Sequence, residues 1–152
     1  MIYEQRDPEF WRDVAADPAV SPSMFGIDPE ALDAVISHPN VLPLASENGG
    51  MLFTSRCGFA KVWELHTLYK PQGWGREVLF AAKQAFARLF GEGAEIVFTH
   101  EQTSNWRTRP PKSFGFRPQG EPFESMFGMA RLWILTKAAW ADSPAQKRME
   151  AH

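Results

Sequence analysis

Residues 62–90 constrain the fold more than any other part of the chain, because they predict a strand, a tight turn and a long helix in succession. Residues 62–69 are rich in apolar and aromatic side chains and have the length of a buried strand. Pro71, Gly73 and Gly75 then break the strand. From Val78 onward, apolar residues recur at the spacing of one helical face. A strand that enters a helix through such a turn leaves free N–H groups at the helix N-terminus, which suits an anion, although an ordinary strand–helix connection has the same pattern.

Two capped helices are predicted ahead of this stretch. Asp7-Pro8 and Asp28-Pro29 each place an N-cap residue before a proline at the first helical position. Residues 41–45 and 51–55 are short apolar runs on either side of Glu47-Asn48-Gly49-Gly50, which is a strong hairpin signal. Cys57-Gly58 predicts a second reversal of the chain.

The remainder of the chain predicts further strands and little additional helix. The long helix is expected to end with a left-handed glycine at Gly91. Residues 94–99 then predict a strand parallel to residues 61–69, because a crossover helix joins the two. Pro110-Pro111 permits only a short or broken helix near residues 105–113. Residues 114–116 enter a loop, and 131–136 form a last strand. We expect a single domain over residues 1–140 and a flexible C-terminal tail over 141–152.

Composition limits the functional classes. A chain of 152 residues with 44% hydrophobic and 22% charged residues is globular. The net charge of -2 provides no electrostatic case for nucleic acid or an anionic membrane. The single cysteine, Cys57, excludes an internal disulfide and is compatible with a reducing compartment. With no signal peptide and no apolar run of membrane-spanning length, we expect a soluble, cytoplasmic protein. No residues have the spacing of metal ligands, so we expect no metal site.

Specific residues resemble the GNAT family of acetyl-CoA-dependent N-acyltransferases. The turn from Tyr69 to Arg76, YKPQGWGR, is similar to the proline- and glycine-containing turn of that family, and Asn105 followed by Phe114-Gly115-Phe116 resembles the ending of a later family motif. Glu64 and His66 resemble the E-x-H of phage-encoded GNAT-like proteins, some of which are virion-assembly accessories. The resemblance implies an α/β (α+β) fold, with a GNAT-like mixed sheet, an N-terminal antiparallel meander, a central parallel pair and flanking helices.

The resemblance also implies acetyl-CoA as co-substrate and a set of residues that bind it. In the family, the two central parallel strands splay apart, the pantetheine arm lies between them, and backbone N–H groups of the turn hold the pyrophosphate. The implied coenzyme-binding residues are Leu68, Tyr69, Lys70, Gly73, Trp74, Gly75, Arg76 and Asn105.

Two departures from the family pattern count against activity. Glu77 and Leu79 occupy positions where the family has small residues, and the carboxylate of Glu77 would repel a pyrophosphate unless it pointed to solvent. Many family members also use a tyrosine after the asparagine motif to protonate the leaving thiolate. The only tyrosines here are Tyr3 and Tyr69.

Glu64 and His66 are the candidate catalytic residues. They lie two positions apart on the central strand, so their side chains share one face of it. A carboxylate beside an imidazole can take a proton from an ammonium group directly or through water. The alternative is that the two side chains simply pair on a half-exposed sheet face.

Two functions therefore remain open, with a base-modifying enzyme acting on DNA through the same fold as a distant third that the overall charge does not favour. One is an N-acyltransferase that moves an acetyl group from acetyl-CoA to an amine of a small molecule or protein. The other is a non-catalytic GNAT-fold accessory, assembly or binding protein of the phage type, with a phage protein or a second copy of the chain as partner. The sequence does not identify the amine acceptor.

Overall fold

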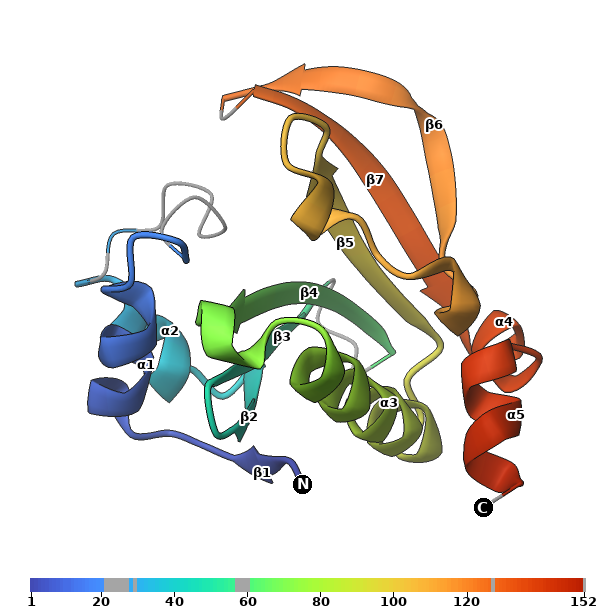
Figure 1. Cartoon of the computed structure of the whole chain (residues 1–152), viewed down its shortest axis with the longest axis horizontal. Coiled ribbons are helices and arrows are strands. Elements are labelled where there is room, and N and C mark those ends of the chain that lie inside the picture. The colour runs from blue at the N-terminus through green and yellow to red at the C-terminus, as the bar shows by residue number, and fades with distance from the viewer. Residues whose placement is uncertain (21–27, 29, 57–60, 127, 152) are drawn as a thin grey trace. The chain divides into compact units, whose positions relative to one another are not determined.

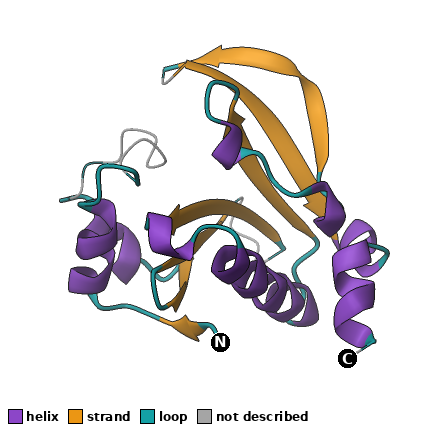
Figure 2. Ribbon diagram, viewed as in Figure 1, coloured by secondary structure: helices purple, strands orange, loops and turns teal. Residues whose placement is uncertain are grey.

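The computed structural model describes residues 1–20, 28, 30–56, 61–126 and 128–151. The chain divides into two compact units. The first unit comprises Met1–Ser55 and Leu65–Ala85, and the second comprises Arg56–Glu64 and Phe86–His152. The described helices and strands are labelled in Figure 1 and coloured by type in Figure 2. None of the helices in the described ranges is long and apolar enough to cross a bilayer.

The first unit begins with two helices packed beside a hairpin. Its elements are β1 (Tyr3–Glu4), α1 (Pro8–Ala15), α2 (Leu32–Ser37), β2 (Val41–Ser46), β3 (Gly49–Ser55), most of β4 (Val62–Tyr69), the 3-10 turn η2 (Pro71–Gly73) and the first part of α3 (Arg76–Gly91). The side chain of Asp7 caps α1 by accepting from the Glu9 N–H at 3.0 Å, as predicted. Helix α2 begins later than expected, because Asp28 closes a turn on the Glu30 N–H ahead of it.

The hairpin prediction is confirmed. Strands β2 and β3 are antiparallel from the pair Val41–Thr54 to the pair Ser46–Gly49, which leaves Glu47 and Asn48 as the turn. Trp11, Ile36 and Leu52 are buried in one apolar cluster that joins α1 and α2 to the hairpin. The expected reversal at Cys57-Gly58 lies outside the described residues.

The second unit contains the parallel pair. Residues Val62 to Glu64 of β4 run parallel to Ile96 to Phe98 of β5 (Ile96–Gln102). Strand β5 is antiparallel to β7 (Gly128–Thr136), and β7 is antiparallel to β6 (Arg117–Ser125). The strand order of the seven-stranded sheet is β1-β2-β3-β4-β5-β7-β6. The predicted fold class, a mixed sheet with a central parallel pair and flanking helices, is confirmed.

Strand β6 was missed by the sequence patterns. Its sequence contains Pro118, Gly120 and Pro122, which are strand-breaking residues, and most of its side chains are exposed. A proline is tolerated there because β6 has a partner on one side only, at the end of the strand order. Figure 1 shows β6 and β7 as a long hairpin in orange.

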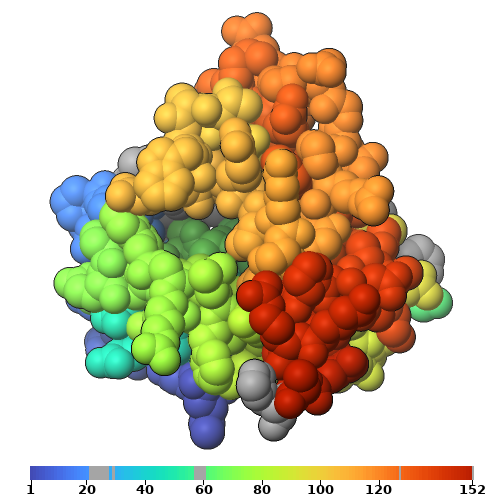
Figure 3. Space-filling model, turned by 45° about the vertical axis from the view of Figure 1, so that its right-hand side comes forward, coloured from blue at the N-terminus to red at the C-terminus, as the bar shows by residue number. Residues whose placement is uncertain are grey.

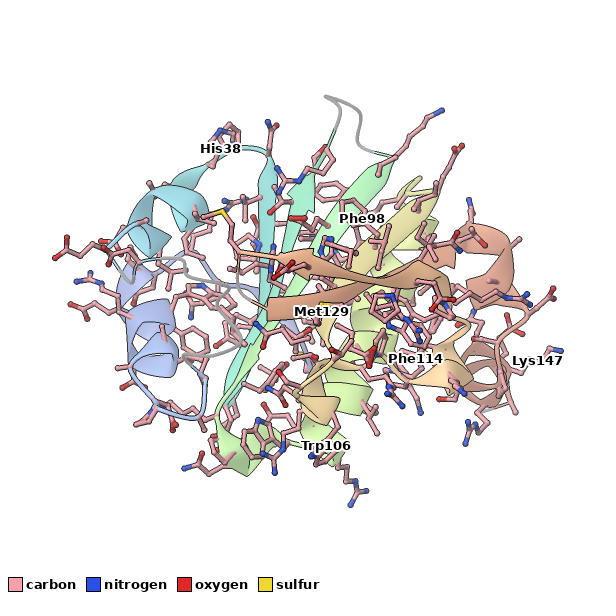
Figure 4. All side chains as sticks on the ribbon, turned by 90° about the horizontal axis from the view of Figure 1, so that it is seen from above. His38, Phe98, Trp106, Phe114, Met129 and Lys147 are labelled. Atoms are coloured by element: carbon pink, nitrogen blue, oxygen red, sulfur yellow. The ribbon has the colours of Figure 1, made fainter. Side chains whose placement is uncertain are left out.

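The core of the second unit is aromatic. Phe86 makes edge-on contacts with Phe114, Phe116 and Trp140, each at a ring-centroid distance of 5.7 Å. Trp140 belongs to α4 (Lys137–Ala141), which follows β7 directly. Several of the twelve phenylalanines and six tryptophans of the chain thus pack a core, and Figure 4 shows Phe114 among other side chains and away from the margin of the view.

Two details differ from the sequence expectations. Gly91 is the last residue of α3, and the left-handed glycine after the helix is Gly93, with φ 111°. The segment over 141–152, expected to be a flexible tail, carries helix α5 (Pro144–Glu150). The side chain of Ser143 caps this helix by accepting from the Gln146 N–H, and Ala145 is buried, so both a cap and a packing contact stabilise α5.

Candidate functional site

The turn between β4 and α3, residues 70–76, is closed by its own backbone. The Gly73 N–H donates to the Lys70 carbonyl at 2.9 Å, and the Trp74 N–H donates to the Pro71 carbonyl at 3.1 Å. The Trp74 indole N–H reaches back to the Tyr69 carbonyl at 3.0 Å. Gly75 has φ 87°, a left-handed conformation that favours glycine, and it directs the chain into α3. The turn is therefore a defined local structure.

The start of α3 carries backbone N–H groups that no described acceptor occupies. Within the described residues, the N–H groups of Gly75, Arg76, Glu77 and Val78 have no acceptor. Such groups and the helix dipole together favour an anion at a helix N-terminus. In Figure 3, light-green atoms from this part of the chain lie on the visible surface, and both Gly75 and Arg76 are exposed.

Glu77 does not turn its carboxylate toward solvent. Its Oε2 accepts from Ser46 Oγ at 2.7 Å and from the Asn48 N–H at 2.9 Å, and its Oε1 accepts from the Asn48 side-chain amide at 2.8 Å. Partial burial opposes the charged form, but these hydrogen bonds outweigh burial and lower the pKa of Glu77 below its ordinary value. The carboxylate is thus held by the β2–β3 turn.

Tyr69 is part of the same polar group. Its hydroxyl lies 2.8 Å from Ser46 Oγ. Because Ser46 uses its own proton for Glu77, Tyr69 donates to Ser46. Burial raises the pKa of Tyr69 to about 12, and the nearby Glu77 charge adds to the effect. This hydroxyl is engaged and buried, and is not placed to protonate a leaving group.

Lys70 is held by groups of the first unit. Its ammonium donates to Asp13 of α1 at 2.5 Å. Its backbone N–H donates to the Asn48 carbonyl at 2.9 Å, and its carbonyl accepts from Gly73. Lys70 therefore anchors the turn.

The two candidate catalytic residues lie in different surroundings. Glu64 is 8% exposed, and its Oε1 accepts from Arg56 at 2.6 Å. His66 is half-buried two positions further along β4. The paired register of β4 with β5 covers Val62 to Glu64. The expected gap between these strands beyond Glu64 stays a prediction, as do both catalytic roles.

Asn105 organises a short turn of the second unit. Its Oδ1 accepts from the Arg107 N–H at 3.2 Å and caps η3 (Trp106–Thr108). The Thr108 hydroxyl donates to the Asn105 carbonyl at 2.7 Å and also accepts from the Gln102 N–H at 2.8 Å. Trp106 is 74% exposed, lies near the margin of Figure 4, and has the Arg107 guanidinium 5.0 Å from its ring centroid.

One buried charge was not among the predicted site residues. Glu101, on β5, is 2% exposed and accepts from Arg109 Nε at 2.6 Å and from the Trp133 indole at 3.3 Å. Arg109 follows η3 and precedes the 3-10 turn η4 (Lys112–Phe114). In the sequence Glu101 shortly precedes Arg107, Arg109 and Lys112, and this proximity does not say which of them it pairs with. Among the described residues, no three His, Cys, Asp or Glu side chains are grouped to hold a metal ion.

Comparison with known proteins identifies the fold. No protein-family model matches the sequence, and no curated protein matches it. Among solved structures, an aminoglycoside 6'-acetyltransferase type Ii is similar with a TM-score of 0.69 at 13% identity, over 90% of this chain and 97% of that one. The spermidine N-acetyltransferase from Vibrio cholerae, solved in complex with CoA and spermine, is similar with a TM-score of 0.71 at 12% identity, over 93% and 98%.

A third similar structure is Mycobacterium smegmatis RimJ in complex with CoA-disulfide, with a TM-score of 0.71 at 15% identity over 99% of this chain and 88% of that one. An acetyltransferase of the GNAT family from Bacillus anthracis has a TM-score of 0.68 at 14% identity, over 90% of this chain and 94% of that one. At these identities the comparison establishes the fold alone. The chain has the fold of the GNAT acetyltransferases.

Proposed function

We propose that this protein is an N-acyltransferase that moves the acetyl group of acetyl-CoA to an amine. The observation that carries the proposal is the start of α3, where Gly75 and Arg76 are exposed and the N–H groups of Gly75 to Val78 have no acceptor within the described residues. Similar structures solved with CoA have the same fold. A pyrophosphate at this turn would accept hydrogen bonds from those N–H groups, and the helix dipole would stabilise its negative charge.

The contacts refine the proposed roles of the coenzyme-binding residues. The N–H groups of Gly75 to Val78 are proposed to face the pyrophosphate. Gly73 and Trp74 shape the turn, because the Gly73 N–H and the Trp74 N–H and indole are already used within it. Lys70 supports the turn through Asp13. Leu68 and Tyr69 are proposed to meet the pantetheine arm through their backbones, and Asn105 acts through the turn it caps.

The reaction needs one proton acceptor and a polarised thioester. The ammonium group of the acceptor loses a proton to the base, its nitrogen attacks the thioester carbonyl carbon, the C–S bond breaks, and CoA leaves as a thiolate that is then protonated. Arg56 already compensates the charge of Glu64. We therefore assign proton uptake to His66, with Glu64 as its charged neighbour along β4.

No tyrosine is placed as general acid. Tyr69 is engaged with Ser46, and Tyr3 lies on β1 at the start of the chain. A thiol has an ordinary pKa of about 8.5, so CoA can depart as a thiolate near neutral pH without a protein acid. The absence of this tyrosine is expected to slow turnover without abolishing it.

The charge of the N-terminal helices favours a cationic acceptor. Every charged residue from Asp7 to Asp33 is acidic except Arg12. Such an asymmetric field raises the local concentration of positively charged amines and falls with added salt. Polyamines and aminoglycosides are the first acceptors to screen.

The test begins with acetyl-CoA alone. At one hundred times its dissociation constant, a ligand that binds only the native state adds about 2.7 kcal/mol of stability. For a chain of this size that corresponds to a rise in Tm of roughly 5–11 °C. Turnover is then measured by the release of free thiol with a panel of amines. His66→Gln is expected to lower kcat while leaving acetyl-CoA binding intact.

The alternative function is a non-catalytic binding or assembly protein with the same fold. The observation in its favour is the engaged hydroxyl of Tyr69. Binding of acetyl-CoA without thiol release from any amine, or no binding at all, would favour it. A phage protein or a second copy of the chain as its partner stays a prediction.

A further inference from the structure

A polar group joins the β2–β3 turn to both ends of the 70–76 turn. Asn48 accepts the Lys70 N–H at 2.9 Å through its carbonyl, ahead of the turn. It also donates its own N–H at 2.9 Å and its side-chain amide at 2.8 Å to Glu77, after the turn. One residue of the hairpin therefore spans the turn from its first residue to the first turn of α3.

The Glu77 carboxylate is the centre of this group. Ser46 Oγ is the third donor, 2.7 Å from Glu77 Oε2, and it is also hydrogen-bonded to the buried Tyr69 hydroxyl. Hydrogen bonds to an ionised group are stronger than those between neutral groups. Gly73 lies against the same residues, since a Cβ there would be 3.1 Å from Asn48 Cβ and 3.4 Å from Glu77 Cδ.

We propose that Glu77 is a positioning residue, which holds the N–H groups of Gly75 to Val78 in the orientation that binds the pyrophosphate of acetyl-CoA. This inference rests on the proposed function. The GNAT family has a small residue at this position, which places no negative charge near the pyrophosphate. The proposal explains why a carboxylate can occupy the position in this chain. Ser46 and Asn48 draw the carboxylate into the hairpin, so the charge is compensated by three donors.

The positioning role and a purely electrostatic effect of Glu77 predict opposite changes in acetyl-CoA affinity when the carboxylate is removed. If Glu77 acted on the coenzyme only through its charge, removing that charge would tighten acetyl-CoA binding. If it fixes the turn, removing it frees the turn and weakens binding. Loss of the hydrogen bonds to an ionised group is expected to raise the dissociation constant by about tenfold or more.

The experiment compares Glu77→Gln and Glu77→Ala with Glu47→Gln. Glu47 is an exposed residue of the same hairpin turn, next to Asn48, and its substitution removes one negative charge without touching the group around Glu77. Calorimetry measures the dissociation constant of acetyl-CoA, steady-state kinetics separate KM from kcat, and hydrogen exchange measures the amides of residues 70–79 in the protein without ligand.

The expected result is weaker binding in the order wild type, Glu77→Gln, Glu77→Ala. KM for acetyl-CoA should rise more than kcat falls, amide exchange over residues 70–79 should be faster, and Glu47→Gln should match the wild type. Unchanged or tighter binding in both Glu77 variants would overturn the proposal. If Glu77→Ala does not fold, Ser46→Ala replaces it, because it removes a single donor to Glu77, and it must also weaken binding.

Acetyl-CoA binding and the positioning role of Glu77 are tested by separate measurements. If the wild type binds no acetyl-CoA, the proposed function is wrong. Hydrogen exchange still decides whether Glu77 holds the turn. Exchange over residues 70–79 that is the same in the wild type and in Glu77→Ala would reject the positioning role even if acetyl-CoA binds.

Discussion

Gly73 tests the packing of the 70–76 turn through a single added methyl group. An alanine Cβ at this position would lie 2.8 Å from Tyr69 Cδ1 and 3.1 Å from Asn48 Cβ. The first distance is too short for a carbon–carbon contact, so the Tyr69 ring or the turn must shift. Tyr69 is buried and its hydroxyl is bonded to Ser46, so the ring has little freedom to yield. Overpacking of this kind costs about 1–3 kcal/mol.

Alanine substitutions at two other glycines distinguish the cost of steric overlap from the cost of backbone strain. Gly75 has φ 87°, and a Cβ added there would meet nothing within 4 Å, so Gly75→Ala carries only the left-handed backbone penalty, roughly 1–2 kcal/mol. Gly91 is helical and also has nothing within 4 Å of an added Cβ, so Gly91→Ala should be neutral or stabilising by up to about 1 kcal/mol. The predicted order of stability is Gly91→Ala, wild type, and then the two turn variants.

Urea unfolding followed by tryptophan fluorescence measures these differences, with the m-value checked for constancy. A loss of about 1–3 kcal/mol corresponds to a fall in Tm of roughly 2–12 °C. If Gly73→Ala is as stable as Gly91→Ala, the Cβ of residue 73 has room that the structure denies it, and the packing argument for this turn is refuted.

The remaining predictions concern three charged or polar groups. Because the folded-state pKa of Glu77 lies below its ordinary 4.5, its ionised form stabilises the fold above pH 4.5, and that stability is lost as the pH falls through the folded-state pKa; Glu77→Gln should therefore flatten the acid side of a stability–pH profile. Arg109→Ala leaves Glu101 buried without its ion-pair partner and should cost about 3–5 kcal/mol by urea unfolding, and adding Glu101→Gln should recover part of that loss, whereas equal single and double variants would contradict the pairing. Ser143→Ala removes the cap of α5 and should cost about 1 kcal/mol, with faster amide exchange in that helix; unchanged exchange would show that the cap does not order the segment.

Local signals were sufficient for the elements around the site. Asp7-Pro8, the Glu47-Asn48 turn and Pro71 each act within a few residues, so caps and turns were predicted close to their observed places. The apolar face of α3 was predicted for the same reason. The parallel pairing of β4 with β5 followed from the crossover helix between them.

Elements that depend on their neighbours were missed. Strand β6 carries prolines that argue against a strand, and it forms because β7 offers a hydrogen-bonding edge. Residues 141–152 were expected to form a flexible tail because they are small and polar, yet Pro144–Glu150 form α5 and the buried Ala145 gives this helix a packing contact. Neither the edge nor the contact is visible in the sequence of the segment itself.

The sequence by itself determined the strand–turn–helix unit at residues 62–90 and the N–H groups at the start of α3 that no acceptor in the described part of the chain occupies, because the responsible residues are neighbours along the chain. Only the tertiary structure decided where the charges go. Glu77 meets Ser46, a residue 31 positions away, and Glu101 pairs with Arg109 and Trp133. In the sequence, a glutamate that would repel an anionic ligand looks the same as one that stabilises a turn. The hydrogen-bond donors that distinguish the two roles are brought to the carboxylate only by folding.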